Sequence, residues 1–106
     1  MSDDAPSYFH DAEVEHEGRT VRLPADEARR EQSRGNYWHG PGDPSTWLAA
    51  ALFCAVRARL DLPVPVALTL AARSLGVTQE ALRGKLEWHE NYMRWHDGDQ
   101  DYSVLS

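Results

Sequence analysis

Basic side chains gather in the middle of the chain, where they could bind an anion. The whole chain has a formal net charge of −6. Residues 57–86 carry five basic and two acidic groups, whereas residues 1–33 carry four basic and nine acidic groups. Residues 87–106 carry one basic and five acidic groups. A basic segment between acidic flanks can mark an anion-binding face, although uneven surface charge is the plainer interpretation.

Aromatic residues form a second chemical pattern. Trp88, Tyr92 and Trp95 follow i, i+4, i+7 spacing, which predicts one face of a helix. An adjacent stripe holds Leu82, Leu86, His89, Met93 and His96. One interpretation buries both stripes in the core. The other makes Trp88, Tyr92 and Trp95 a partner interface, because Trp and Tyr are enriched at interface hot spots. A homodimer through this helix is its simplest form.

Metal, cofactor and catalytic chemistry find little support in the sequence. The single cysteine, Cys54, lies in an apolar run and cannot form a multi-thiolate zinc site. On one helix, His89 and His96 would lie about 10 Å apart, too far for one ion. No Gly-rich phosphate loop, nucleophile elbow or dinucleotide fingerprint is present. We therefore expect no catalytic residue, no metal and no cofactor. Tyr37-Trp38-His39 could line a small pocket, although a loop anchored by two aromatic residues is the plainer interpretation.

The elements that position these residues indicate one mainly helical α+β domain over residues 1–106, with tails at 1–7 and 97–106. Residues 12–23 predict a β-hairpin turning at Glu17-Gly18. It would pair Ala12 with Leu23 and Val14 with Val21 on one face, and Glu13 with Arg22 on the other.

Helices follow the hairpin. Residues 25–33 predict a short polar helix. Asp43 and Pro44 predict the start of a central apolar helix that runs to about Leu60 and is ended by Pro63 and Pro65. The next two helices are expected at about 66–74 and from Thr78 to about Trp95 or His96, with Gly76 between them.

The segment from Leu70 to Leu86, LAARSLGVTQEALRGKL, resembles the helix-turn-helix of Fis-type bacterial DNA-binding domains. In it Ala72 is small where the helices cross, Gly76 allows the tight turn, and Leu82 and Leu86 face the core. The resemblance implies that the last helix enters the DNA major groove.

The resemblance also implies the DNA-binding side chains. Gln79, Glu80 and Arg83 would lie at base edges, and Arg73 and Lys85 would contact phosphates, with Thr78 capping the helix. Glu80 and the acidic continuation of the helix do not suit this use. A purely structural helical hairpin therefore remains the alternative.

Two functional hypotheses follow. The first is a small helix-turn-helix DNA-binding transcriptional regulator of a bacterium or phage, acting as a dimer on double-stranded DNA. The second is an acidic protein-interaction module, such as an antitoxin, an adaptor or a phage-encoded inhibitor, which uses the aromatic face of helix 78–96. We expect no enzyme. The acidic N-terminus lacks an apolar signal region and the longest apolar run has ten residues, so a cytoplasmic location without membrane insertion is expected.

Overall fold

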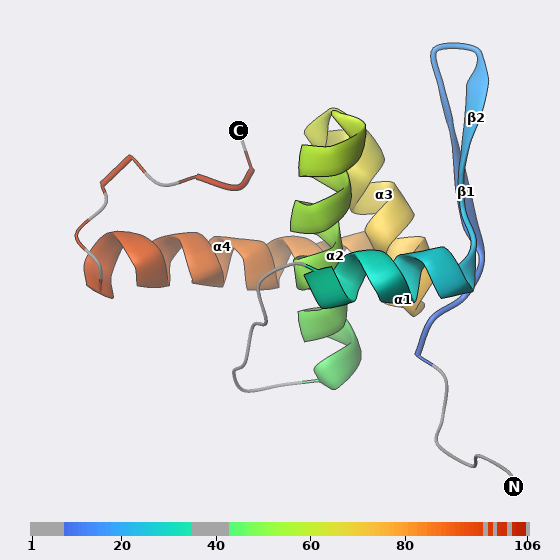
Figure 1. Cartoon of the computed structure of the whole chain (residues 1–106). Helices are drawn as coiled ribbons and strands as arrows, with labels where there is room; N and C mark the ends of the chain where they lie inside the picture. The colour runs from blue at the N-terminus through green and yellow to red at the C-terminus, as the bar shows by residue number, and fades with distance from the viewer. Residues whose placement is uncertain (1–7, 35–42, 97, 99, 102, 106) are drawn as a thin grey trace, which may run out of the picture.

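The computed structural model describes residues 8–34, 43–96, 98, 100–101 and 103–105. It has a two-stranded hairpin followed by helices, an α+β fold that is mainly helical, as the sequence predicts (Figure 1). The Tyr37-Trp38-His39 segment lies outside the described residues.

The hairpin has the predicted register. Strand β1 (Ala12–His16) pairs antiparallel with β2 (Arg19–Leu23), so that Ala12 faces Leu23 and Val14 faces Val21. Glu17 and Gly18 form the turn with positive φ angles of 52° and 77°. Two successive positive φ angles match the right-handed twist of the strands, which is why the turn needs only two residues.

Helix α1 (Ala25–Arg34) begins directly after the hairpin. The Asp11 carboxylate accepts a hydrogen bond from the Ala25 N–H at 2.8 Å and so joins the start of α1 to the residue before β1. Ala28 and Glu31 are the buried residues of its described side chains, and Glu31 forms an ion pair with Arg59 of the next helix at 2.6 Å. Helix α1 thus packs against the central helix.

Helix α2 (Pro44–Leu60) is the central helix. It contacts α1, α3 and α4, and its buried side chains form the middle of the core. The Asp43 side chain accepts from the Ser45 N–H at 3.3 Å, as expected for a cap, and Pro44 stands in the first turn. The helix ends at Asp61, which is left-handed (φ 55°) and donates its N–H to the Arg57 carbonyl.

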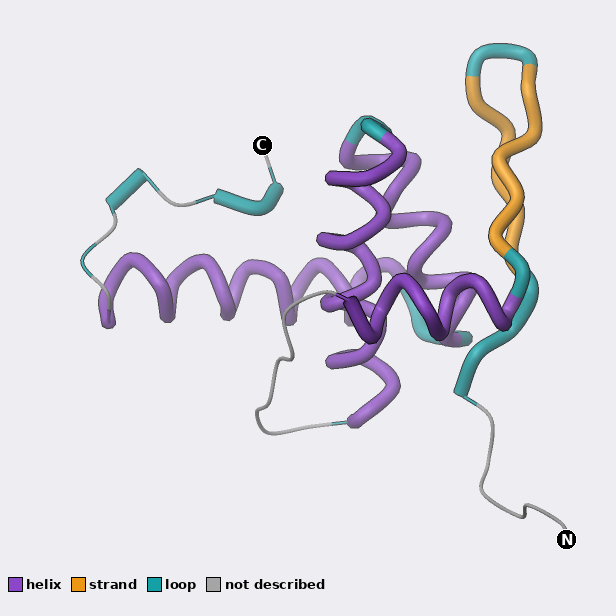
Figure 2. The backbone as a smooth tube through the Cα atoms, viewed as in Figure 1, coloured by secondary structure: helices purple, strands orange, loops and turns teal. Residues whose placement is uncertain are grey.

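Helix α3 (Val64–Leu75) starts earlier than the sequence predicts. Because α2 already ends at Asp61, Pro63 becomes the residue that precedes α3, and Pro65 fits in its first turn, where no backbone N–H is needed. Helix α3 packs against α2 on one side and β1 on another. The tube view shows the hairpin standing beside α3 (Figure 2).

Helix α4 (Gln79–His96) crosses the bundle and contacts both α2 and α3. Its N-terminal half crosses the other helices, whereas its C-terminal half extends beyond them (Figure 1). Leu82 and Leu86 are fully buried and anchor α4 on the core, as the sequence predicts. No described helix is long and apolar enough to cross a membrane.

Candidate functional site

The junction between α3 and α4 has the geometry expected of a tight helix–turn–helix. Gly76 is left-handed, with φ 69°. The Val77 N–H donates to the Ala72 carbonyl at 3.0 Å, and the Thr78 hydroxyl accepts from the Ala81 N–H at 3.0 Å. Thr78 therefore caps α4, which fixes where the helix starts and which side chains its first turn presents.

Two of the side chains predicted to contact DNA are exposed but hydrogen-bonded to other elements of the chain. The Arg73 guanidinium donates to the backbone carbonyl of Glu13 on β1 at 2.6 Å. The Gln79 side-chain amide donates to the Thr69 hydroxyl of α3 at 3.1 Å. Each of these hydrogen bonds joins two elements of the fold and would compete with contacts to a ligand.

The other predicted DNA contacts differ from one another. The Lys85 ammonium lies 4.6 Å from the centre of the Trp47 ring, a cation–π contact that attaches α4 to the start of α2. Arg83 and Glu80 are both exposed on α4. Arg83 thus lies three residues from the Glu80 carboxylate on α4. It is the one exposed arginine in the N-terminal half of this helix.

Helix α4 instead exposes its aromatic side chains. Trp88 is 43% exposed, Tyr92 41% and Trp95 83%, the last being the most exposed large hydrophobic residue among those described. The interpretation that buries both stripes in the core is therefore wrong for the stripe formed by Trp88, Tyr92 and Trp95. The C-terminal half of α4 extends beyond α2 and α3 (Figure 1). Among the described residues, this leaves the aromatic face, defined as Trp88, Tyr92 and Trp95, partly exposed at Trp88 and Tyr92 and mostly exposed at Trp95.

Ring contacts order the aromatic face. Trp88 meets the buried Trp47 edge to face, with centroids 5.5 Å apart. Tyr92 stacks on Trp88 at 5.4 Å and on His96 at 4.8 Å. This series of ring contacts fixes Trp88 and Tyr92 against the helix body, so contacts within the chain itself order these two side chains. A preorganised surface loses less side-chain entropy on binding.

Sequence reasoning missed the small residues that continue this face. Ala81 and Gly84 are exposed, and a Cβ added at Gly84 would meet no atom within 4 Å. With Trp88, Asn91 and Trp95 they are spaced by alternating three and four residues, the interval that places side chains along one helical seam. We call Ala81, Gly84, Trp88, Asn91 and Trp95 the exposed seam. The 3-4 spacing was the available signal.

The opposite side of α4 holds a buried carboxylate. Glu90 is 8% exposed, and its Oε2 accepts hydrogen bonds from the Ser103 hydroxyl and from the N–H groups of Val104 and Leu105, at 2.7–2.9 Å. Burial by itself would raise the pKa of Glu90. These hydrogen bonds, with the nearby Arg94 charge, outweigh it and lower the pKa below its ordinary value.

The last described residues are therefore attached to the helices. Besides the Glu90 contacts, the Val104 carbonyl accepts from the Arg57 guanidinium at 2.8 Å. Residues 103–105 form a strap that joins α4 to α2 on the side away from the exposed seam. After Leu82 and Leu86, the buried face of α4 continues at Glu90 and does not follow the predicted stripe through His89, Met93 and His96. Burial lowers the pKa of His89 below its ordinary value, and the nearby Glu90 charge partly opposes this shift.

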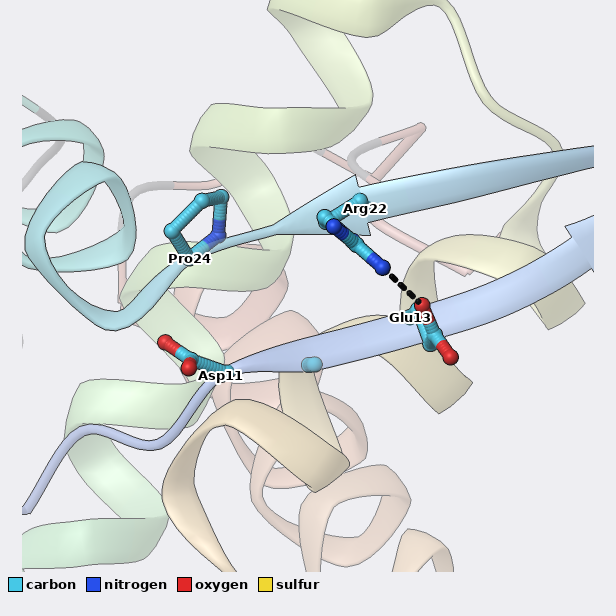
Figure 3. A pocket seen from close by; sticks show the side chains of 5 residues that line it. Asp11, Glu13, Arg22 and Pro24 are labelled. Carbon is cyan, nitrogen blue, oxygen red and sulfur yellow. Dashed lines mark hydrogen bonds and ion pairs between the residues drawn. The ribbon is translucent and has the colours of Figure 1, made fainter.

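An open hollow lies at the base of the hairpin (Figure 3). Its polar side chains already have structural partners: Arg22 reaches across the strands to the Glu13 carboxylate at 3.2 Å, and Asp11 accepts from the start of α1. The Arg22–Glu13 pair is solvent-exposed. The hollow thus lies where the hairpin meets α1, and the described polar side chains that line it serve structural contacts.

Cys54 does not have the environment of a reactive thiol. Burial raises its pKa to about 12, and the nearby Arg57 charge offsets this only in part. Its thiol is therefore protonated and a poor nucleophile at neutral pH. Within the described ranges, no three His, Cys, Asp or Glu side chains come together as metal ligands.

Comparison of the chain with protein-family models, with curated proteins and with solved structures found no match.

Proposed function

We propose that this chain is a protein-interaction module that binds its partner through the aromatic face of α4. The observation that carries the proposal is the 83% exposure of Trp95, next to the half-exposed Trp88 and Tyr92, on a half-helix that projects from the bundle. A tryptophan that becomes buried on binding removes about 150–250 Å² from water.

The surroundings of the face support the same use. Trp88 and Tyr92 are held by ring contacts that start from the buried Trp47, so the face is rigid at its inner end and open at Trp95. Rigid aromatic anchors with an exposed tip are typical of hot spots.

Photo-cross-linking tests the proposal. A benzophenone amino acid replaces Trp95, and in a control variant it replaces Leu60, which is 43% exposed at the end of α2. After irradiation of cells that produce the chain, we expect a defined protein adduct from position 95 and none from position 60. The same outcome at both positions, or no adduct at position 95, would contradict the proposal.

DNA binding by the α3–α4 junction is the second candidate. The observation that favours it is the tight turn at Gly76 with Thr78 as the cap, which leaves Arg83 exposed on the first turns of α4. It ranks second because Arg73 and Gln79 already donate hydrogen bonds to other elements of the chain and Lys85 lies over the Trp47 ring, so contacts to DNA would have to replace these. The regulator hypothesis predicts micromolar or tighter binding of fragmented DNA by fluorescence anisotropy, weakening steeply with salt, and its loss in Arg83→Ala.

A further inference from the structure

We propose that the place on α2 and α4 where the strap at residues 103–105 is seated is a binding site for an extended peptide segment of another protein, and that the strap occupies this site within its own chain. The site lies on the side of α4 opposite to Trp88 and Trp95, so it does not depend on the proposed function. We call it the strap site, defined as the residues of α2 and α4 that hold the strap or line the hollow beside it: Phe53, Cys54, Arg57, Ala58 and Glu90.

Two charged side chains of the strap site hold the backbone of the strap from two different helices. The Glu90 Oε2 accepts from the Val104 N–H at 2.7 Å and from the Leu105 N–H at 2.9 Å. The Arg57 guanidinium of α2 donates to the Val104 carbonyl at 2.8 Å. The N–H and the C=O of one residue are therefore both bound, and any peptide without proline at these positions offers the same groups. Recognition of this kind takes its affinity from the main chain and its specificity from side-chain pockets.

Glu90 makes this position of α4 dependent on a bound segment. It follows Leu82 and Leu86 on the buried face of the helix and is only 8% exposed. A buried carboxylate has a large desolvation cost unless hydrogen bonds satisfy it, whereas an apolar residue would continue the packing without that cost. The donors come from the strap, including the Ser103 hydroxyl at 2.9 Å. Glu90 thus selects a segment that presents successive donors, with a small hydroxyl side chain ahead of them.

The hollow beside the strap is larger than its present occupant requires. It has a volume of about 270 Å³ and opens between Val104 and the side chains of Phe53, Cys54 and Ala58 on α2. Val104 is partly buried against the core and borders this space without filling it. A longer aliphatic side chain at the same position would bury more apolar surface. The strap is therefore a weaker occupant than a peptide with leucine in place of Val104.

The strap can leave while the helices stay packed. Residues 103–105 belong to no helix or strand, and Ser103 is exposed. Segments with few buried contacts open at a free energy well below that of global unfolding. Helices α2 and α4 contact each other directly, and Val56 and Leu86 are fully buried in the core that they share. The strap site is therefore available to a competing segment in the folded protein.

Two variants of the full chain with an unseated strap provide the test. Ser103→Asp places a second carboxylate beside Glu90, and Val104→Asp places a charge against the hollow. A fluorescent peptide with the sequence of residues 100–106 is titrated with each variant and followed by anisotropy. We expect a Kd below about 1 mM, because the strap stays seated at the millimolar effective concentration that a short tether gives. The wild type should bind the same peptide at least about tenfold more weakly, because its own strap competes.

Matched changes test whether the peptide occupies the strap site. In the Ser103→Asp chain, Glu90→Gln should weaken peptide binding about 5- to 30-fold, because a charged acceptor becomes a neutral one. Glu80→Gln is the control, since it removes the same charge from an exposed position on the first turn of α4 and should leave the affinity unchanged.

Two altered peptides test how the bound segment is recognised. A peptide with an N-methylated leucine lacks the N–H that Glu90 accepts, and its binding should be lost. A peptide with leucine in place of the valine adds one CH₂ group to the hollow and should bind about fourfold more tightly.

Each outcome supports or overturns the proposal. Binding that Glu90→Gln weakens and Glu80→Gln does not would support it. Folded Ser103→Asp and Val104→Asp chains that bind no peptide would show that the strap has a purely structural role. The same conclusion would follow if circular dichroism showed both variants unfolded. A dimer by light scattering that forms only with an intact strap would assign the site to a second copy and overturn a foreign peptide as the occupant.

Discussion

Leu86 and Trp95 lie nine residues apart on α4, yet one is fully buried and the other is 83% exposed. The buried face of α4, formed by Leu82, Leu86 and Glu90, touches the bundle and the strap at residues 103–105. The opposite face carries the exposed seam. A helix that only completed a core would need apolar residues on one face. The buried face thus has a role in folding, and under the proposed function the exposed face has a role in binding, so single substitutions should separate the two.

The largest expected effect belongs to the buried face. Leu86→Ala should lower the free energy of unfolding by about 2–5 kcal/mol, because it leaves a cavity at a fully buried site. Urea denaturation followed by circular dichroism measures it. A loss below ~1 kcal/mol would show that α4 is not anchored on the core in this way.

Trp95→Ala should have the opposite effect to Leu86→Ala, weakening binding while leaving stability nearly unchanged. Its free energy of unfolding should stay within about 0.5 kcal/mol of the wild type, because the side chain is mostly in water. The affinity of the complex formed through α4 should fall by at least about 2 kcal/mol, as for a hot spot. Isothermal titration or dilution calorimetry gives the binding value. Unchanged affinity would move the interface elsewhere.

Glu90→Gln should cost about 1–2 kcal/mol of stability, because a charged acceptor of three hydrogen bonds becomes a neutral one. The folded-state pKa of Glu90 lies below its ordinary value of 4.5. Its contribution is therefore present above pH 4.5 and is lost as the pH falls through the folded pKa.

Unfolding free energies of wild type and Glu90→Gln, measured between pH 7 and pH 3, provide the check. The two curves should converge as the pH falls. A constant gap down to pH 3 would mean that the carboxylate charge does not hold the strap.

Gly84→Ala should have the smallest effect, a gain of about 0.5–1 kcal/mol in monomer stability. Glycine lowers the stability of an exposed helix interior by about that amount relative to alanine, and the added methyl group meets no atom. Thermal unfolding followed by circular dichroism measures it. A destabilised Gly84→Ala monomer would indicate contacts at this position within the chain itself.

The sequence predicted the parts of the fold that depend on local chemistry. The hairpin register follows from cross-strand pairs such as Glu13 with Arg22, and the helix ends follow from Asp43, Gly76 and Thr78. The predicted start of α3 was two residues late, because Pro65 was assigned to the break after α2, whereas proline is tolerated in the first turn of a helix.

The site was less predictable, because it depends on contacts between distant segments. Nothing local to Glu90 indicates that Ser103, Val104 and Leu105 supply its hydrogen bonds. The spacing of Trp88, Tyr92 and Trp95 identified a common face. Its exposure depends on how far α4 extends beyond α2 and α3, which only the three-dimensional arrangement determines.

Hydroxyl-radical footprinting tests most directly whether a binding partner covers the aromatic face of α4 inside cells. Oxidation of Trp95 is compared, by mass spectrometry, between intact cells that produce the chain and the purified chain at nanomolar concentration, with Leu60 as the reference. We expect Trp95 to be protected in cells and Leu60 to be oxidised equally in both samples. Equal oxidation of Trp95 in the two samples would contradict it.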